Sequence, residues 1–506
     1  MRGSGCLNIR KKYWAAVLPY QTSKQMEHPV ASKPSPEFPM INVGKLNSKA
    51  TYARTRPLTA VDLPDPLDGI EITDEYCAVE SLLVQGCPIV FVTGKAGTGK
   101  TTLIHYLRHK LNKNIVVVAP TGVAALNIKG ATIHSFFRFP ARIVNDDDIK
   151  KLSDRKLYTR LDLLVIDEIS MVRADLMDAM DKFLRLNGRN PDKPFGGTQL
   201  LIVGDLFQLP PVVTREEESV LFARPYTSPF FFSAKALQDC AFAPVELTRI
   251  YRQTDPEFME MLNKIRVAEN LESVIPVIND ACYSRDVQDS FITLTCTNAR
   301  ADQINLAELD ELPGEPRTFV GMKTGKFRLE DSRLPSPMDL KLKPGAQVMF
   351  TKNDGEKRWV NGTLGQIVAF KENSIQVELV SDHPGSIHDV QQVTWETYKY
   401  EYDYRKDRIK HTVIGRYTQY PLMLAWAVTI HKSQGKTLEK VRLDVGSGAF
   451  ASGQVYVALS RCRSLEDLSL ARAIQARDVK CDQRIKRFYL GVAAAQPSDH
   501  GHNSQW

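Results

Sequence analysis

The chain has 506 residues, of which 43% are hydrophobic and 25% charged, proportions typical of globular proteins that exclude a fibrous or low-complexity chain. Its net charge of +7 is uneven, because residues 1–60 carry ten Lys or Arg against two Asp or Glu, which leaves −1 for residues 61–506. The body of the protein is therefore not broadly basic, and any nucleic-acid site must be a local groove.

The cysteines and the lengths of the apolar runs limit the cellular compartments in which the protein is expected. Eight cysteines are scattered without a C-x-x-C pair or a zinc-spaced histidine, which predicts reduced, intracellular, metal-free thiols. The longest apolar run, Pro421–Ile430, has ten residues, whereas a membrane span needs about 18. Pro19 interrupts the apolar stretch Trp14–Tyr20, so no secretory signal is predicted. The predicted location is the cytoplasm (nucleoid). The nucleus or mitochondrion stays open, because no acidic residue precedes Glu27.

Residues 1–68 hold eight prolines and many Ser and Lys without sustained periodicity, which predicts a disordered basic tail. Structure is expected to begin near Ile70. The residues Ile72-Thr73-Asp74-Glu75 are typical of a helix start, and the predicted helix runs to Leu83.

The phosphate-binding pattern G-x-x-x-x-G-K-[ST] runs from Gly94 to Thr101, between a predicted strand, Ile89–Thr93, and a predicted helix, Lys100–Leu111. Its glycines let backbone N–H groups surround phosphates, and the helix N-terminus adds positive potential. We expect Lys100 to neutralise the β- and γ-phosphates and Thr101 to bind Mg²⁺. The residues expected to bind the nucleotide here are Gly94, Lys95, Ala96, Gly97, Thr98, Gly99, Lys100, Thr101 and Thr102.

Two carboxylates follow a later apolar run. Strands are predicted at Ile115–Ala119 and Leu163–Ile166, and the second ends in Asp167-Glu168. At the end of a buried strand, Asp167 could hold Mg²⁺, directly or through water, and Glu168 could polarise the attacking water. A helix N-cap with an acidic first turn would look the same, and both interpretations can hold.

A further predicted strand, Leu200–Val203, runs into Gly204–Pro211. Gln208 lies just beyond its end, where an amide can contact the γ-phosphate, although a plain polar loop residue would look the same. Alternating strands and helices with ligands at strand ends predict a parallel α/β sheet. This first domain is expected to cover residues 69–245.

The α/β pattern restarts after Val245–Ile250, with a helix predicted over Pro256–Arg266 and a strand over Phe291–Cys296. It returns at Pro421 and ends with a strand over Leu468–Leu470. The second domain is thus predicted to be discontinuous, over residues 246–342 and 421–490, with a tail over 491–506.

Residues 343–420 differ, because short alternating strands with Asn-Gly and Pro-Gly turns predict a small β-barrel. Between Trp395 and Tyr420, aromatic residues alternate with Lys and Arg. These aromatic residues are Tyr398, Tyr400, Tyr402, Tyr404 and Tyr417. They could stack on nucleic-acid bases or pack a hairpin, and the sequence does not decide between the two.

These segments, in this order, resemble the superfamily-one 5′-to-3′ DNA helicases, most closely the Pif-one group and more distantly the RecD group. The resemblance covers about residues 70–490. Its motifs are Gly94–Thr102, Ala119–Ala125, Thr132–Phe137, Asp167–Met171, Gly204–Pro211, Tyr251–Gln253, Thr429–Thr437 and Tyr456–Arg461. The segment between Met171 and Gly204 resembles the signature insertion of the Pif-one group.

The resemblance implies two RecA-like P-loop NTPase domains with parallel sheets, and ATP with Mg²⁺ between them. It implies that Arg252 and Arg461 reach the γ-phosphate from the second domain, where planar guanidinium groups suit the charge on the transferred phosphoryl oxygens. A surface salt bridge is the alternative for Arg461. Gln434 and Gly435 match the motif that couples nucleotide to DNA.

The resemblance also implies DNA contacts, although His134, on an apolar segment, is as well explained by structure alone. The expected DNA-contacting residues are Thr121, Val123, His134, Phe137, His431 and Ser433. The β-barrel would be the family's inserted, Src-homology-three-like accessory domain, and Ile143–Arg160 its strand-separating wedge. The sequence departs from the family pattern at the residue that recognises the adenine base. The family usually has a glutamine there, whereas this chain has Tyr76. Adenine selectivity is therefore in doubt, and Tyr76 is a candidate to stack on the base.

The implied activity is ATP hydrolysis that drives 5′-to-3′ translocation on single-stranded DNA and unwinding of forked duplex, in replication, recombination, repair or telomere maintenance. A monomer is expected. A RecD-like nuclease subunit, an RNA-stimulated NTPase and a non-catalytic module with a decayed helicase fold stay as alternatives. The intact Lys100, Asp167, Glu168 and both arginines oppose the last of these.

Overall fold

The computed structural model describes residues 70–494, except positions 225, 239, 241 and 254 and the segments 284–290 and 381–384. The predicted tail over residues 1–68 and the end of the chain after residue 494 lie outside the described residues. None of the helices that are described is long and apolar enough to cross a membrane.

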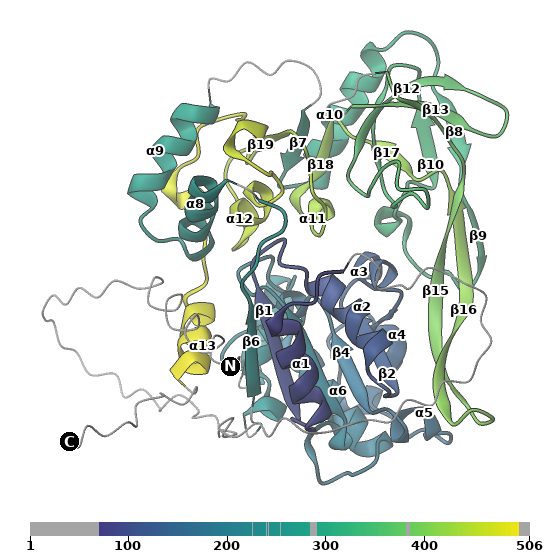
Figure 1. Cartoon of the computed structure of the whole chain (residues 1–506), viewed down its shortest axis with the longest axis vertical. Helices are drawn as coiled ribbons and strands as arrows, with labels where there is room; N and C mark the ends of the chain where they lie inside the picture. The colour runs from purple at the N-terminus through teal and green to yellow at the C-terminus, as the bar shows by residue number, and fades with distance from the viewer. Residues whose placement is uncertain are drawn as a thin grey trace, which may run out of the picture. The chain divides into compact units, whose positions relative to one another are not determined.

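A six-stranded parallel sheet in the order β3-β2-β4-β5-β1-β6 forms the first domain (Figure 1). Its strands are β1 (Ile89–Gly94), β2 (Ile115–Ala119), β3 (Ala131–Thr132), β4 (Leu163–Ile166), β5 (Gln199–Gly204) and β6 (Phe242–Leu247). The residues of β1, β4 and β5 are all buried, as expected for apolar runs covered on both faces. The predicted boundary at residues 245/246 falls inside β6, which pairs with β1, so it is wrong and the first domain extends to Leu247.

Helices cover both faces of this sheet. They are α1 (Asp74–Val84), α2 (Lys100–Lys110), α3 (Gly122–Asn127), α4 (Ile133–Phe137), α5 (Lys156–Thr159), α6 (Ala174–Asn187) and α7 (Arg215–Ala223). The Thr73 hydroxyl accepts a hydrogen bond from the Tyr76 N–H and caps α1, which confirms the predicted helix start. The described 3-10 helices cover Asp146–Asp148, Ile169–Met171, Pro194–Gly197, Phe231–Ser233, Lys235–Leu237, Asp331–Arg333, Leu465–Asp467 and Ala476–Asp478.

The second domain is built on a parallel sheet in the order β18-β7-β19-β20. Its strands are β7 (Ile292–Thr295), β18 (Ala427–Thr429), β19 (Val441–Asp444) and β20 (Leu468–Leu470). Its helices are α8 (Pro256–Val267), α9 (Leu271–Cys282), α10 (Asn298–Glu311), α11 (Ile430–Ser433) and α12 (Gln454–Leu459). Since β7 and β18 are neighbours from distant parts of the sequence, this sheet is discontinuous, as predicted.

Antiparallel strands make up the inserted part. They are β8 (Arg317–Val320), β9 (Met322–Gly325), β10 (Asp339–Leu342), β11 (Gln347–Phe350), β12 (Leu364–Phe370), β13 (Ile375–Leu379), β14 (Ile387–Val390), β15 (Val393–Asp403), β16 (Arg408–Gln419) and β17 (Leu422–Leu424). The predicted limits, 343 and 420, are wrong, because β9 pairs with β16 and β17 pairs with β11. The described strands form three separate sheets, β14-β13-β12-β11-β17, β15-β16-β9 and β10-β8, so a closed Src-homology-three-like barrel stays a prediction.

The long hairpin of β15 and β16 contacts the first domain (Figure 1). The Tyr400 hydroxyl lies 3.2 Å from the Val117 backbone nitrogen, from which it accepts a hydrogen bond, and the Tyr404 hydroxyl donates to Asp154 at 2.9 Å. Among the aromatic residues of this hairpin, Trp395, Tyr400 and Tyr417 are buried. These three therefore pack the hairpin, and do not lie free for base stacking.

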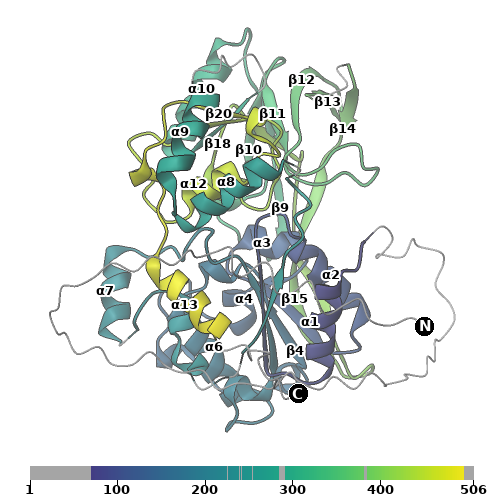
Figure 2. The same ribbon diagram turned by 60° about the vertical axis from the view of Figure 1, so that its left-hand side comes forward.

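The final helix, α13 (Gln483–Ala494), follows the second sheet but packs on the first domain. The rings of Phe488 and Tyr489 contact Phe91 of β1, and the hydroxyls of Tyr489 and Thr93 lie 2.5 Å apart. Figure 2 shows the ribbon of α13 beside the first domain. The predicted tail at 491–506 is therefore wrong as far as Ala494. The helical spacing of Ile485, Phe488 and Val492 provides the apolar face that drives this packing.

Candidate active site in the nucleotide pocket

The phosphate-binding loop has the backbone that its glycines allow. Gly97 and Gly99 have φ angles of 81° and 82°, a region that disfavours side chains. A Cβ atom at Gly97 would also lie 2.6 Å from the Cβ of Arg252. Lys100 begins α2, and its ammonium donates to the carbonyls of Gly94 and Lys95, at 2.8 Å each. The loop amides, helix N-terminus and Lys100 together make an anion site.

This loop forms one wall of a pocket of about 630 Å³. The lining residues are Ile70, Glu71, Tyr76, Ala96, Gly97, Thr98, Gly99, Lys100, Thr101, Thr102, Glu168, Gln208, Tyr251, Arg252, Gly435 and Arg461. Residues far apart in the chain therefore meet at one site. A second pocket of similar volume, about 610 Å³, lies on the inserted part between Arg317 and Tyr420 and contains no residue of the phosphate loop.

Asp167 and Glu168 lie directly after β4, as predicted. Burial, and then the charge of Glu168, raise the pKa of Asp167 to about 7. Burial also raises the pKa of Glu168, although the charges of Lys100 and Arg461 act against this. Glu168 has a φ of 50°, a costly conformation for a residue with a side chain, and its carboxylate caps no helix. The N-cap alternative therefore does not explain this residue.

The Thr101 hydroxyl in the pocket lining is an oxygen ligand of the kind that Mg²⁺ prefers, and so is the carboxylate of the buried Asp167, which precedes the lining residue Glu168. One oxygen of Asp167 accepts the Glu168 N–H at 2.9 Å. No cluster of three or more His, Cys, Asp or Glu side chains in the described part of the chain could hold a metal ion alone. The residues thus fit an ion that is shared with nucleotide phosphates, for which one or two protein ligands suffice.

The two arginines come from the other side of the pocket. Arg252 follows β6 and donates to the Thr437 hydroxyl at 2.9 Å and the Ser460 carbonyl at 3.2 Å. Arg461 donates to the carbonyls of Val457 and Lys436, at 2.8 and 3.1 Å. Burial, and then the charge of Arg252, lower the pKa of Arg461 to about 9. Two guanidinium groups that repel each other in a buried site favour an anionic ligand. Arg461 is 1% exposed, which contradicts the surface salt-bridge alternative.

Gln208 and Gln434 lie together beside Glu168. The Gln434 amide nitrogen donates to Glu168 at 3.0 Å and to the carbonyl oxygen of the Gln208 side chain at 3.4 Å. Gln208 is buried and lines the pocket, so it is not a plain polar loop residue. Gly435, with a φ of 79°, continues this wall.

Tyr76 lines the pocket, but its ring is not placed as the stacking hypothesis requires. It is 2% exposed, its ring lies 5.9 Å from that of Tyr106, and its hydroxyl donates to the Gly99 carbonyl at 2.7 Å. Its ring is therefore packed into the core and is not free to stack on a base. Tyr251 is 46% exposed in the same pocket, and its N–H donates to the Gly97 carbonyl at 2.9 Å. Sequence reasoning missed Tyr251 as a lining residue, although it adjoins Arg252.

The six expected DNA-contacting residues divide into two groups. Phe137 is 1% exposed and packs on Phe183, and Ser433 is fully buried with its hydroxyl on the Ile430 carbonyl, so their side chains do not contact DNA in this structure. Val123 is exposed, whereas His134 and His431 are half-buried. Thr121 caps α3 through the Ala124 N–H. DNA contact by the other four residues stays a prediction.

Comparison with known proteins decides the family. Residues 73–277 match the model of the PIF1-like helicases. The chain is 32% identical to the mouse (Mus musculus) ATP-dependent DNA helicase PIF1 over 98% of its own length and 75% of the mouse protein. The chain belongs to the PIF1-like helicase family. The resemblance seen in the sequence is thus confirmed.

Solved structures of PIF1-like helicases match the fold. Bacteroides Pif1 in complex with ADP-AlF4 aligns with a TM-score of 0.77 and 37% identity, over 84% of this chain and 98% of that one. Bacteroides Pif1 bound to single-stranded DNA aligns over the same shares with 38% identity but a TM-score of 0.61. This PIF1-like chain therefore aligns better with the first complex than with the second.

Proposed function

We propose that this chain is an ATP-dependent DNA helicase that moves 5′-to-3′ along single-stranded DNA and unwinds forked duplex in genome maintenance. One observation carries the proposal: Lys100 and Glu168 of the first domain line the same pocket as Arg252 and Arg461, which hydrogen-bond to the second. The relatives are named as ATP-dependent DNA helicases, and a solved relative binds single-stranded DNA.

In the proposed reaction, charge develops on the transferred phosphoryl oxygens between cations from both domains. Lys100, Arg252 and Arg461 would stabilise that charge, and Glu168 would orient and polarise the attacking water. When bound at Thr101 and Asp167, Mg²⁺ would neutralise phosphate charge. Because Arg252 and Arg461 hydrogen-bond to residues of the second domain, they would face the triphosphate only while the two domains are together. Hydrolysis and release would then let them separate, which couples the reaction to movement along the strand.

The polarity of unwinding tests this proposal. A forked duplex with only a 5′ single-stranded tail is expected to be unwound with ATP, whereas one with only a 3′ tail is not. A fluorescence strand-separation assay at low salt measures this, since contacts to the phosphate backbone weaken as salt rises. Lys100→Ala serves as the inactive control. Preferred unwinding from the 3′ tail would reverse the proposed direction, and stimulation of ATP hydrolysis by RNA alone would favour the RNA-stimulated NTPase.

Nucleotide selectivity is a second prediction. Position 76 holds a tyrosine and not a glutamine, so this side chain has no amide that could pair with adenine. Its hydroxyl donates to the Gly99 carbonyl instead. A site without such paired groups discriminates weakly, and we expect kcat/KM for ATP and GTP to agree within about tenfold. Steady-state hydrolysis of each nucleotide with saturating single-stranded DNA measures the ratio. An ATP preference above about 10³-fold would show that other groups read the base.

The proposal includes a monomeric protein that acts where genomic DNA is found inside the cell. Light scattering of the free protein measures its mass and tests the monomer. The RecD-like nuclease subunit stays an alternative. Hydrolysis of ATP by the purified chain would exclude the alternative of a non-catalytic module with a decayed helicase fold.

A further inference from the structure

A buried polar network adjoins the nucleotide pocket but is not part of its lining. At its centre is Asp205, 1% exposed, which follows β5. One carboxylate oxygen accepts two hydrogen bonds from Arg266, from Nη2 at 2.9 Å and from Nε at 3.3 Å. The other oxygen accepts from the Tyr456 hydroxyl at 3.1 Å. Arg266 is on α8 and Tyr456 on α12, so the network joins the second domain to the first.

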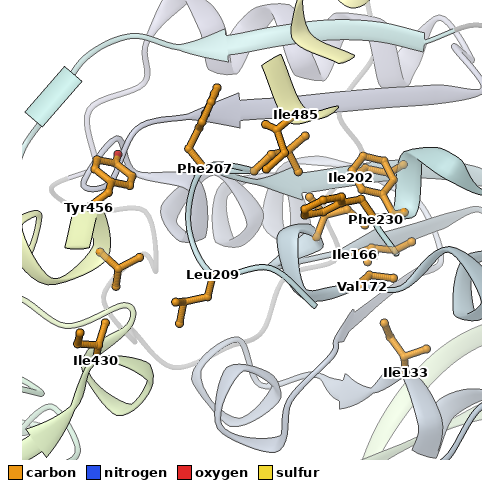
Figure 3. Close-up of a cluster of buried hydrophobic side chains, with 14 of the residues drawn as sticks. Ile133, Ile166, Val172, Ile202, Phe207, Leu209, Phe230, Ile430, Tyr456 and Ile485 are labelled. Atoms are coloured by element: carbon orange, nitrogen blue, oxygen red, sulfur yellow. The ribbon is translucent and has the colours of Figure 1, made fainter. Parts of the chain in front are cut away.

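The ion pair is almost closed to solvent, because the side chains of Arg266 and Asp205 are 10% and 0% exposed. The Arg266 guanidinium also lies 4.3 Å from the centre of the Phe207 ring (Figure 3 labels Phe207 and Tyr456). Burial alone would raise the pKa of Asp205, but the charges of Arg266 and Lys100 outweigh it and lower the pKa. Asp205 is therefore an ionised acceptor whose partner comes from the other domain.

Asp205 in turn fixes the amide of Gln208. The Gln208 side-chain nitrogen donates to the second oxygen of Asp205 at 3.4 Å. A carboxylate can only accept, so the amide nitrogen must face Asp205 and the amide oxygen must face the other way. That oxygen accepts from Gln434, which also donates to Glu168. A chain of contacts thus leads from Arg266 to the carboxylate proposed to polarise water.

Tyr456 makes a second connection from Asp205 to the phosphate loop. Its hydroxyl donates to Asp205 and accepts the Ala96 N–H at 3.3 Å. Any shift of α8 or α12 relative to the first sheet therefore disturbs both the loop backbone and Gln208. This position differs from that of Arg252 and Arg461, because Arg266 does not line the pocket.

We propose that Arg266 is a positioning residue: from the second domain it holds Asp205, and through Asp205 it sets the orientation of the Gln208 amide for hydrolysis. The inference rests on the proposed ATPase. Since Arg266 acts through Asp205, it should affect kcat much more than the binding of ATP. Its loss should also have no further effect once Asp205 no longer carries a charge.

The test compares Arg266→Met, Asp205→Asn and the double variant, with saturating single-stranded DNA. In each, kcat is expected to fall about 10- to 100-fold, because misplacing a catalytic group by about 1 Å costs this much, while KM changes less than about threefold. The double variant should be no slower than Asp205→Asn alone. Arg266→Lys keeps the charge but loses the forked donor and the ring contact, so an intermediate kcat is expected.

Removing Arg266 alone leaves a buried carboxylate unpaired and lowers stability, so melting curves accompany the kinetics. The double variant removes both charges, and it decides the question if Arg266→Met does not fold. Arg472→Met is the matched control, because Arg472 pairs through two hydrogen bonds with the buried Asp478 inside the second domain. It should melt at a lower temperature with unchanged kcat.

Failure of this inference can be distinguished from failure of the proposed function. If the wild-type chain shows DNA-stimulated ATP hydrolysis and the folded Arg266 variants match its kcat, the positioning role is wrong and the proposed function stands. A double variant slower than Asp205→Asn would show that Arg266 acts by another route, and this also overturns the inference. If the wild-type chain has no DNA-stimulated hydrolysis, the proposed function itself fails.

Discussion

Glu168→Gln is expected to lower kcat for ATP hydrolysis by about 10²- to 10⁴-fold, the usual contribution of a general base, while ATP and DNA binding stay measurable. The amide keeps the shape of the side chain but cannot accept a proton. Burial already raises the pKa of Glu168, which makes its carboxylate a stronger base than an exposed glutamate. Phosphate release with saturating single-stranded DNA measures kcat, and fluorescence anisotropy of labelled DNA measures binding.

Glu80→Gln is the matched control for this variant. Glu80 is a glutamate of the same domain that accepts the Tyr106 hydroxyl at 2.5 Å and does not line the nucleotide pocket. Its replacement should leave kcat unchanged. Lys100→Ala should abolish hydrolysis as well, because it removes the ammonium that faces the phosphates. Wild-type turnover in Glu168→Gln would mean that another group activates water.

Features that depend on neighbouring residues in the sequence were predicted well. The bounds of β4 and β20 agree with the expected strands, because short, dense apolar runs leave few alternatives. The phosphate loop and the Asp167-Glu168 pair follow directly from the strands that precede them. The convergence of the loop and Glu168 in one pocket also follows from the sequence, since ligands at the carboxyl ends of parallel strands share an edge of the sheet.

Features that depend on distant pairing were not predicted. The insert begins at β8 and not at residue 343, because β8 pairs with β10 and the partner of β9 is β16, about 90 residues later in the chain. The return of α13 to the first domain could have been suspected from its apolar spacing, but not the surface on which it packs. Phe137 and Ser433 match motif positions, yet tertiary packing buries both side chains.

The Arg266–Asp205 pair beside the nucleotide pocket also depends on distant pairing and was not predicted from the sequence. Each residue looks ordinary in the sequence, one within a predicted helix and one after a predicted strand. Only the fold, which places Arg266 of α8 beside the end of β5, brings them together. Sequence motifs therefore identified the groups that face the nucleotide, whereas the groups that hold them required the fold.

Arg461→Lys is expected to bind ATP with little change but to hydrolyse it about 10³-fold more slowly, the lower end of the range for an arginine that stabilises phosphoryl transfer. Lysine keeps one positive charge but cannot contact two phosphoryl oxygens in a plane. It also cannot replace the bonds that Arg461 donates to the carbonyls of Val457 and Lys436. A fluorescent ATP analogue measures binding, and phosphate release measures kcat.

Arg461→Ala should show the same kinetic defect with a larger loss of stability, because it removes the donor to the Lys436 carbonyl and leaves a cavity at a buried position. The lysine variant is therefore the decisive one. Arg463→Lys is the matched control, since Arg463 lies two residues further on and is exposed. If Arg461→Lys folds, binds ATP and retains wild-type kcat, the second domain does not contribute this arginine to hydrolysis. Coupling between the domains would then have to depend on Arg252 and on the contacts of α8 and α12 with the phosphate loop.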